Sequence, residues 1–324
     1  MRAVAIMTGS TADTATPETV LRLAGITKRF GPLVANDAIG FDLRRGEIIA
    51  LLGENGAGKT TLMNILFGHY VADEGEIEIF GRRLLPGSPR AAISAGIGMV
   101  HQHFTLAENL SVLDNIMLGT EGLWRWVTDR GAARQRLDKL AADFGLHIDG
   151  DARVADLSVG ERQRVEILKV LYREARILIL DEPTAVLTPQ ESTALFQTLA
   201  KLVAQGLSVI FISHKLNEVL AVSSRILVLR GGKLVAERRT AETTKAELAT
   251  LMVGREIPPP KIEPQLPGAV GDTPVPSLAP MLKTRMIANG VGSRQTLIGL
   301  GTDDLRDALD RRVVFSVTDC SRAR

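Results

Sequence analysis

The stretch LLGENGAGKTTLMNIL, Leu51–Leu66, places three glycines, a lysine and two threonines between apolar residues. Its segment Gly53–Thr60 fits the P-loop pattern G-x-x-x-x-G-K-[ST]. The apolar run EIIALLG at 47–53 reads as a buried strand, and 59–67 reads as a helix. In this strand–loop–helix setting the pattern predicts a loop that holds a chain of phosphates, with an ordinary glycine-rich turn as the alternative.

The loop pattern gives each polar group an expected role. Backbone N–H groups at the start of the helix would surround the β-phosphate, and Lys59 would reach the β- and γ-phosphates. The Thr60 hydroxyl would bind Mg²⁺. The residues that we expect to contact such a nucleotide are Gly53, Glu54, Asn55, Gly56, Ala57, Gly58, Lys59, Thr60 and Thr61.

The composition of the 324 residues excludes several classes of protein. A net charge of +2 is too small to argue for binding to nucleic acid or to an anionic membrane surface. The single cysteine, Cys320, leaves no internal disulfide and fits a reducing compartment. No apolar run approaches the ~20 residues that span a bilayer, so we expect any role at a membrane to depend on a partner.

Between Leu21 and Val253, short apolar runs alternate with helical patterns. Such alternation predicts an α/β fold with a parallel sheet and crossover helices. The expected elements are buried strands at 47–53, 176–182 and 207–213, an amphipathic helix at 188–206, antiparallel strands at 21–30 and 75–84, and a mostly helical region at 91–173 that is interrupted by GIGMV.

The composition divides the chain into four parts. We expect a disordered N-terminus at 1–20, a folded domain at 21–255, a proline-rich linker at 256–280 and an unassigned tail at 281–324. Eight of the fourteen prolines fall in Pro258–Pro280, which argues against a packed core there. The tail holds one amphipathic pattern, TDDLRDALDRR, and is too short for a second domain like the first.

A second polar site follows a predicted strand. In ILILDEP, four apolar residues lead to Asp181 and Glu182 at the carboxyl edge of the sheet, where open α/β sheets bind ligands. Asp181 is placed to hold Mg²⁺ through water, and Glu182 to orient or deprotonate an attacking water. Alone, such a pair is more often a solvated strand end. Together with a P-loop it predicts hydrolysis.

A third motif is the run LSVGERQRVEILKVLY, Leu157–Tyr172, which places a serine and a glycine before a helix. The first turn of that helix carries Glu161, an acidic residue that suits the helix dipole. An ordinary capped helix would explain Ser158 by itself. It would not explain the whole run in the company of the two other motifs.

Taken in order, the P-loop, LSVGE-R-Q-R, ILILDEPT and an isolated ISH resemble the nucleotide-binding subunit of ATP-binding-cassette (ABC) transporters. The resemblance covers about Leu21–Val253. It implies a P-loop ATPase core with a parallel sheet, an antiparallel β subdomain and a helical subdomain that carries the signature run. The runs ITKRFGPLVAND, VHQHFTLAENLSVLDNIMLG and LSVGERQRVEILKVLYREARILILDEPTAVLTPQE are similar to importers of simple sugars and, more closely, of nucleosides.

The resemblance implies roles for three residues that the patterns alone leave open. Phe30, 29 residues before Lys59, lies where the family stacks an aromatic ring on adenine, although a lone Phe is more often core. Gln102 matches the glutamine that contacts Mg²⁺ and senses the membrane partner. His214, two residues past the strand SVIFI, matches the histidine that contacts the γ-phosphate, although a lone His at a strand end is usually structural. ATP and Mg²⁺ are therefore the expected cofactors.

In the family, the signature segment closes over the nucleotide held by a second domain; here its residues are Ser158 and Gly160, with Val159 between them. The resemblance therefore implies two such domains, head to tail, as a homodimer or with a paralogous subunit. Permease subunits and a substrate-binding receptor are the further implied partners, without nucleic acid, at the cytoplasmic face of the membrane. ATP would join the two domains and hydrolysis would release them, which can drive a membrane partner between two states.

Two residues and the length depart from the family pattern. Val159 stands where glycine is commoner, and Thr188 stands where many relatives carry aspartate, in a loop that communicates with the partner domain. The sugar and nucleoside relatives usually carry two such domains in one chain, yet no second P-loop, signature or Asp-Glu strand end follows residue 274. We expect a truncated or frame-shifted product whose tail at 281–324 is foreign to the family, with a dedicated short tail as the alternative.

Three functions stay open at this point. The first is an ATPase subunit that energises uptake across a membrane. The second is an ABC ATPase that acts on nucleic acid or the ribosome, which the short spacing from Lys59 to Ser158, the nearly uncharged linker and the small net charge disfavour. The third is a regulatory module that binds ATP but hydrolyses it poorly.

Overall fold

The computed structural model describes residues 18–120 and 129–254. The predicted linker and tail, at 256–280 and 281–324, and most of the predicted N-terminal tail lie outside the described residues. The first strand begins at Thr19, so Thr19 and Val20 belong to a sheet rather than to a disordered N-terminus. Val20 is buried in the core, which explains the earlier start.

The larger sheet of the described residues has six strands in the order β10-β9-β3-β8-β7-β6. Neighbours from β9 to β6 pair in parallel, which confirms the predicted parallel sheet, whereas β10 pairs antiparallel with β9 at one edge. The strand bounds are β3 Ile48–Leu52, β6 Ile97–Val100, β7 Ile177–Asp181, β8 Ser208–Ser213, β9 Arg225–Arg230 and β10 Lys233–Arg239.

The smaller sheet is antiparallel, with the strand order β2-β1-β4-β5, and confirms the predicted β subdomain. Its strands are β1 Thr19–Phe30, β2 Leu33–Arg44, β4 Glu74–Ile79 and β5 Arg82–Arg83.

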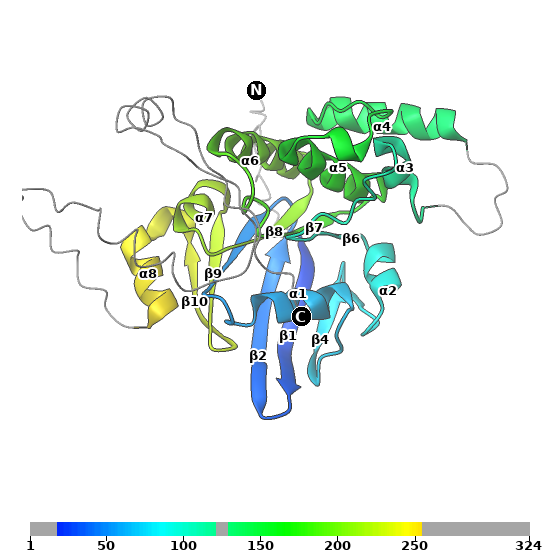
Figure 1. Cartoon of the computed structure of the whole chain (residues 1–324). Coiled ribbons are helices and arrows are strands. Elements are labelled where there is room, and N and C mark those ends of the chain that lie inside the picture. Colours follow the sequence, from blue (N-terminus) through cyan, green and yellow to red (C-terminus); the bar gives the residue numbers. More distant parts are fainter. Residues whose placement is uncertain (1–17, 121–128, 255–324) are drawn as a thin grey trace, which may run out of the picture. The chain divides into compact units, whose positions relative to one another are not determined.

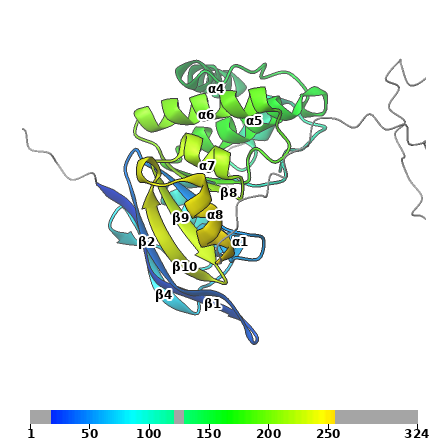
Figure 2. The same cartoon turned by 90° about the vertical axis from the view of Figure 1, so that its left-hand side faces the viewer.

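Helices surround the larger sheet. Figure 1 shows α3, α4, α5 and α6 gathered above it, with β1, β2 and β4 below, and Figure 2 shows α7 and α8 beside β9 and β10. Within the described ranges, no helix has both the length and the apolar character needed to cross a bilayer. The helices are α1 Lys59–Phe67, α2 Pro89–Ser94, α3 Val112–Met117, α4 Arg130–Phe144, α5 Val159–Tyr172, α6 Pro189–Ala204, α7 Leu216–Val222 and α8 Lys245–Val253, with 3-10 turns at Val154–Asp156 and Thr240–Glu242.

The central strands are apolar on both faces because both faces are covered. Ile177 and Ile179 of β7 pack into the core shared with β1, β2 and α1. Leu178 and Leu180 of the same strand point the other way and pack with residues of α3, α4, α5 and α6. A parallel sheet buried in this way leaves its carboxyl edge as the place where polar groups gather.

Candidate functional site

The P-loop forms where β3 leaves the sheet and α1 begins. All five residues of β3 are buried, and the chain turns through Gly53–Gly58 before α1 starts at Lys59. Gly58 has a φ of +99°, in the left-handed region that favours glycine. A side chain there would also collide with the carbonyl oxygen of Ala35 and would lie 2.7 Å from Asn36 Nδ2. Glycine is therefore required at this position by conformation and by space.

Lys59 lies inside the loop, with 5% of its surface exposed. Its Nζ donates hydrogen bonds to the carbonyl oxygens of Gly53 at 2.7 Å and Glu54 at 2.9 Å. Burial lowers the pKa of the Lys59 amine, while Glu182 and Asp181 act in the opposite direction. The ammonium is thus held within the loop and close to two carboxylates.

Asp181 and Glu182 end β7 at the carboxyl edge of the sheet. Asp181 is 7% exposed, and burial, with a smaller effect of Glu182, raises the pKa of its carboxyl against the opposing effect of Lys59. Glu182 has a φ of 46°, which residues other than glycine usually avoid. Its Oε1 lies 2.9 Å from Nδ1 of His214, which follows the neighbouring strand β8.

A cleft of about 590 Å³ opens beside these groups. It joins the loop and the carboxylates to Phe30 from β1 and Gln102 from the segment after β6. The predicted residues that line it are Phe30, Asn55, Gly56, Gly58, Lys59, Thr60, Thr61, Gln102, Asp181 and Glu182. Gly53, Glu54, Ala57 and His214 do not line it; Gly53 and Glu54 hold Lys59, and His214 reaches the cleft through Glu182.

Five residues that the sequence analysis did not single out also line the cleft: Leu33, Val34, Ala35, Gly231 and Gly232. The mouth is apolar around Phe30, which is 43% exposed and meets the ring of Tyr70 edge-on at 5.6 Å between centroids. Gly231 and Gly232 form the turn between β9 and β10. A glycine pair between two apolar runs was the available signal for that turn.

The signature residues Ser158 and Gly160 lie at the start of α5 and do not line the cleft. Ser158 caps the helix, and its backbone N–H and hydroxyl donate to Glu161 Oε2 at 2.9 Å and 2.8 Å. These hydrogen bonds lower the pKa of the Glu161 carboxyl. Ser158 and Gly160 therefore lie outside the P-loop cleft of their own copy of the domain.

Thr188, one of the departures from the family pattern, caps α6. Its side chain and backbone form a capping box with Glu191, with distances of 2.9 Å from both Thr188 donors to Glu191 Oε2. A side chain at Gly160 would collide with the carboxylate of Glu191. Threonine at 188 thus fixes the start of α6, and the same Glu191 lies against the signature segment.

Two buried polar side chains hold the segment that follows Gln102. Glu166 of α5, 4% exposed, accepts hydrogen bonds from Thr105 N at 2.6 Å and Thr105 Oγ1 at 2.9 Å. Asn115 of α3 bonds both backbone groups of Ala107. Glu166 stands between Val165 and Ile167, and a polar residue between apolar neighbours in a helix was its sequence signal. Asn115 follows Asp114 and carried no such signal. Through the hydrogen bonds of Glu166, helix α5, whose N-cap is Ser158, contacts the segment that follows Gln102.

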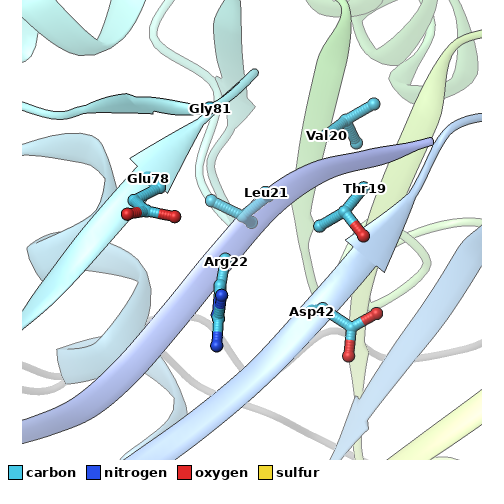
Figure 3. A pocket seen from close by; sticks show the side chains of 7 residues that line it. All are labelled: Thr19, Val20, Leu21, Arg22, Asp42, Glu78 and Gly81. Carbon is cyan, nitrogen blue, oxygen red and sulfur yellow. The ribbon is translucent and has the colours of Figure 1, made fainter.

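A second hollow, of about 340 Å³, lies on the antiparallel sheet (Figure 3). Arg22 of β1 stands there in register with Asp42 of β2 and Glu78 of β4. Opposite charges across neighbouring strands are an ordinary stabilising device of sheets. This hollow therefore offers no chemistry comparable with the P-loop cleft.

Residues 36–185 match the family model described as ABC transporter. The chain contains an ABC transporter domain. Over 240 residues it is 50% identical to the nucleoside import ATP-binding protein NupA of Lactococcus lactis subsp. cremoris, a match that covers 74% of this chain and 47% of that protein. It is 47% identical over 243 residues to the ribose import ATP-binding protein RbsA 1 of Burkholderia thailandensis, covering 74% of this chain and 48% of that protein.

The chain spans about half the length of these curated relatives. The ABC domain also resembles a solved dimeric structure of an ATP-binding cassette in a post-hydrolysis state, bound to ADP and Pi. The TM-score is 0.59 at 25% identity, and the match covers 68% of this chain and 98% of that chain.

Proposed function

We propose that the ABC domain binds MgATP in the P-loop cleft and hydrolyses it with Glu182. The observation that carries this proposal is the convergence of the P-loop, Gln102 and Asp181–Glu182 in one cleft of about 590 Å³. A loop with a lysine, a set of oxygen ligands for magnesium and a carboxylate base are the parts that phosphoryl transfer to water requires.

The nucleotide would lie with its base at the apolar mouth and its phosphates on α1. Phe30 is exposed at the end of β1 and lines the cleft, so its ring would stack on adenine. Gly58 has no side chain to cap α1, so the first N–H groups of the helix stay free for an anion. Lys59 would donate to the β- and γ-phosphates, at a depth where water screens the charge poorly.

The donors around the cleft fit Mg²⁺. The Thr60 hydroxyl, the Asp181 carboxylate and the side-chain oxygen of Gln102 are hard oxygen ligands, and all three residues line the same space. When bound there, the ion would neutralise charge on the phosphates. Burial of Asp181 beside Lys59 keeps this ligand out of bulk water before the nucleotide arrives.

Hydrolysis needs a base, which Glu182 would supply. Its carboxylate would accept a proton from, or orient, the attacking water. His214 Nδ1, 2.9 Å from Glu182 Oε1, would hold that carboxylate in place by donating a hydrogen bond. To donate to the γ-phosphate as well, Nε2 would also have to carry a proton, which makes the ring an imidazolium. The backbone of Glu182 lies in the left-handed region directly after β7, a conformation of the kind that gathers at functional sites.

The full site would be completed by a second cassette. Ser158 and Gly160 lie outside the cleft of their own domain, and the similar solved cassette is a dimer. We infer that these residues close over the nucleotide of the partner, which is a second copy or a paralogous subunit. Binding of ATP would then join two domains, and its cleavage would separate them.

The relatives at 50% and 47% identity are import ATP-binding proteins for nucleosides and for ribose. We therefore propose that this chain energises an importer of nucleosides or simple sugars. It would act with permease subunits and, through them, a substrate-binding receptor, at the cytoplasmic face of the membrane. An ABC ATPase unconnected to transport and a module that hydrolyses ATP poorly are the alternatives.

The test measures the ATPase rate of the purified chain against protein concentration. We expect a rate that rises more than linearly, because two domains form each site, and a loss of about a hundredfold or more in Glu182→Gln. MgATP binding should survive that substitution.

The matched control is Glu76→Gln, which changes a half-exposed glutamate on β4 and should leave the rate unchanged. A low, linear rate that is insensitive to Glu182 would count against hydrolysis at a shared site and in favour of the poorly hydrolysing module.

A further inference from the structure

Two consecutive peptides of the P-loop have their carbonyl groups held by residues outside the loop. The Ala57 oxygen accepts a hydrogen bond from the Gly232 N–H at 3.2 Å. The Gly58 oxygen accepts one from Asn36 Nδ2 at 3.1 Å and one from the Leu62 N–H at 3.0 Å. These donors come from the β9–β10 turn, from β2 and from the first turn of α1.

Fixing a carbonyl also fixes the N–H of the same peptide. In a planar trans peptide the C=O and N–H bonds point in opposite directions. The N–H groups of Gly58 and Lys59 therefore point away from Gly232 and Asn36. These are the backbone donors that a P-loop offers to the phosphates.

The P-loop packs directly against Asn36 of β2, which leaves no room for a side chain at Gly58. Asn36 is completely buried, and its amide lies so close to Gly58 that a Cβ there would be 2.7 Å from Asn36 Nδ2. The turn is also pinned to β2, because the Asp37 N–H donates to the Gly232 oxygen at 2.8 Å. The loop therefore rests against β2 and cannot shift without moving Asn36.

Only one of the two polar atoms of the Asn36 side chain forms a hydrogen bond among the described residues. Its Oδ1 is buried and finds no hydrogen-bond partner among the described residues. An orphaned buried acceptor disfavours folding, and a leucine of similar size would avoid that penalty. The residue's contribution must therefore come from its donor, and the group that receives this donor is the Gly58 carbonyl.

We propose that Asn36 is a positioning residue of the nucleotide site, which aims the Lys59 N–H at the phosphates by holding the Gly58 carbonyl from behind. This rests on the proposed binding of nucleotide in the same cleft. Asn36 itself would not touch the nucleotide. It acts through the direction of a peptide that does.

The experiment measures the Kd of MgATP and of MgADP for the full chain and for Asn36→Leu, together with the melting temperature of each without nucleotide. Both nucleotides should bind about tenfold more weakly, because a misaligned N–H loses one charge-assisted hydrogen bond to the α/β-phosphates. The melting temperature should stay level or rise, because the orphaned oxygen is removed.

If Asn36→Leu does not fold, Asn36→Ala provides the test. We expect the same increase in the Kd of MgATP and of MgADP. The matched control is Ser208→Ala, which removes a buried hydroxyl at the start of β8 that accepts a hydrogen bond from the Gly46 N–H at 3.1 Å and does not line the cleft. It should lower the melting temperature and leave both Kd values within about twofold of the parent.

Unchanged affinity in the Asn36 variants, or a loss confined to MgATP, would overturn the positioning role while leaving nucleotide binding intact. A fall in melting temperature without a change in either Kd would mean that Asn36 serves stability alone. Failure of the unmodified chain to bind either nucleotide would instead overturn the proposed function, and this inference with it.

Discussion

The P-loop and the signature segment are both polar turns that lead into a helix, but they treat the first N–H groups of that helix differently. At α1 the N-cap is Gly58, and the first turn carries no acidic side chain. At α5 the N-cap Ser158 forms a capping box with Glu161, so oxygen atoms of the chain itself already occupy donors there. One helix start is open to an anion, and the other is partly occupied by oxygen atoms of the chain itself.

This difference indicates an order of events. A phosphate that reaches α1 meets free N–H groups and a buried lysine, whereas one that reaches α5 competes with Ser158 and Glu161. We therefore expect nucleotide to bind first at the P-loop, with contact to a signature as a weaker second step. The following predictions test whether the P-loop binds the nucleotide and the signature contributes only in a second step.

The largest effect is expected at the P-loop. Lys59→Ala removes the buried ammonium that would pair with the β- and γ-phosphates, so the Kd of MgATP should rise about a hundredfold or more. Titration of the chain with MgATP measures it. Lys201→Ala, which changes an exposed lysine near the end of α6, should bind like the parent. Wild-type affinity in Lys59→Ala would show that the cleft is not the nucleotide site.

The second prediction separates the regions by mixing two inactive variants. Lys59→Ala keeps its signature, and Gly160→Asp keeps its P-loop but places a carboxylate against Glu191 at the signature. In a two-fold dimer, equal amounts should pair at random and recover about a quarter of the parental ATPase rate, because half the dimers contain one intact composite site.

Each variant alone should be inactive, and the recovered rate should depend on the total protein concentration. A mixture that stays inactive would mean that the signature does not serve the nucleotide of a second copy. A Gly160→Asp variant that is active alone would mean that the P-loop does not need the signature at all.

Much of the fold could be predicted because local sequence patterns specify its helices and strands. The predicted helix at 59–67 has the same bounds as α1, and the predicted strands at 176–182 and 207–213 contain β7 and β8. Continuous apolar runs could be read as buried strands since both faces of the larger sheet are covered. The alternating runs predicted the antiparallel sheet for a different reason, because its strands are buried on one face and more exposed on the other.

What stayed hidden depends on contacts between distant residues. Asn36 reaches Gly58 across 22 positions and Glu166 reaches Thr105 across 61, and no local pattern specifies either pair. The roles assigned to Phe30, Gln102, His214 and the signature came from family resemblance rather than from their surroundings, and they remain proposals.

The smallest expected effect is on stability, at the start of α5, where Ser158 and Glu161 form the capping box. Hydrogen bonds from the Ser158 N–H and hydroxyl lower the pKa of Glu161, so its ionised form stabilises the fold above the usual pKa of 4.5. Glu161→Gln should therefore lower the free energy of unfolding by about 0.5–1 kcal/mol at pH 7, a modest value because the carboxylate is partly exposed.

The sign of the pH dependence gives a sharper test. Since the folded pKa is depressed, the advantage of Glu161 over Gln should shrink as the pH falls below 4.5 and vanish once the carboxyl is protonated in both states. Urea unfolding of the two proteins between pH 3 and pH 7 measures this. If the difference in free energy of unfolding does not depend on pH, Glu161 acts by packing rather than through its charge. The start of α5 would then not differ from that of α1 by an anion that the chain itself supplies.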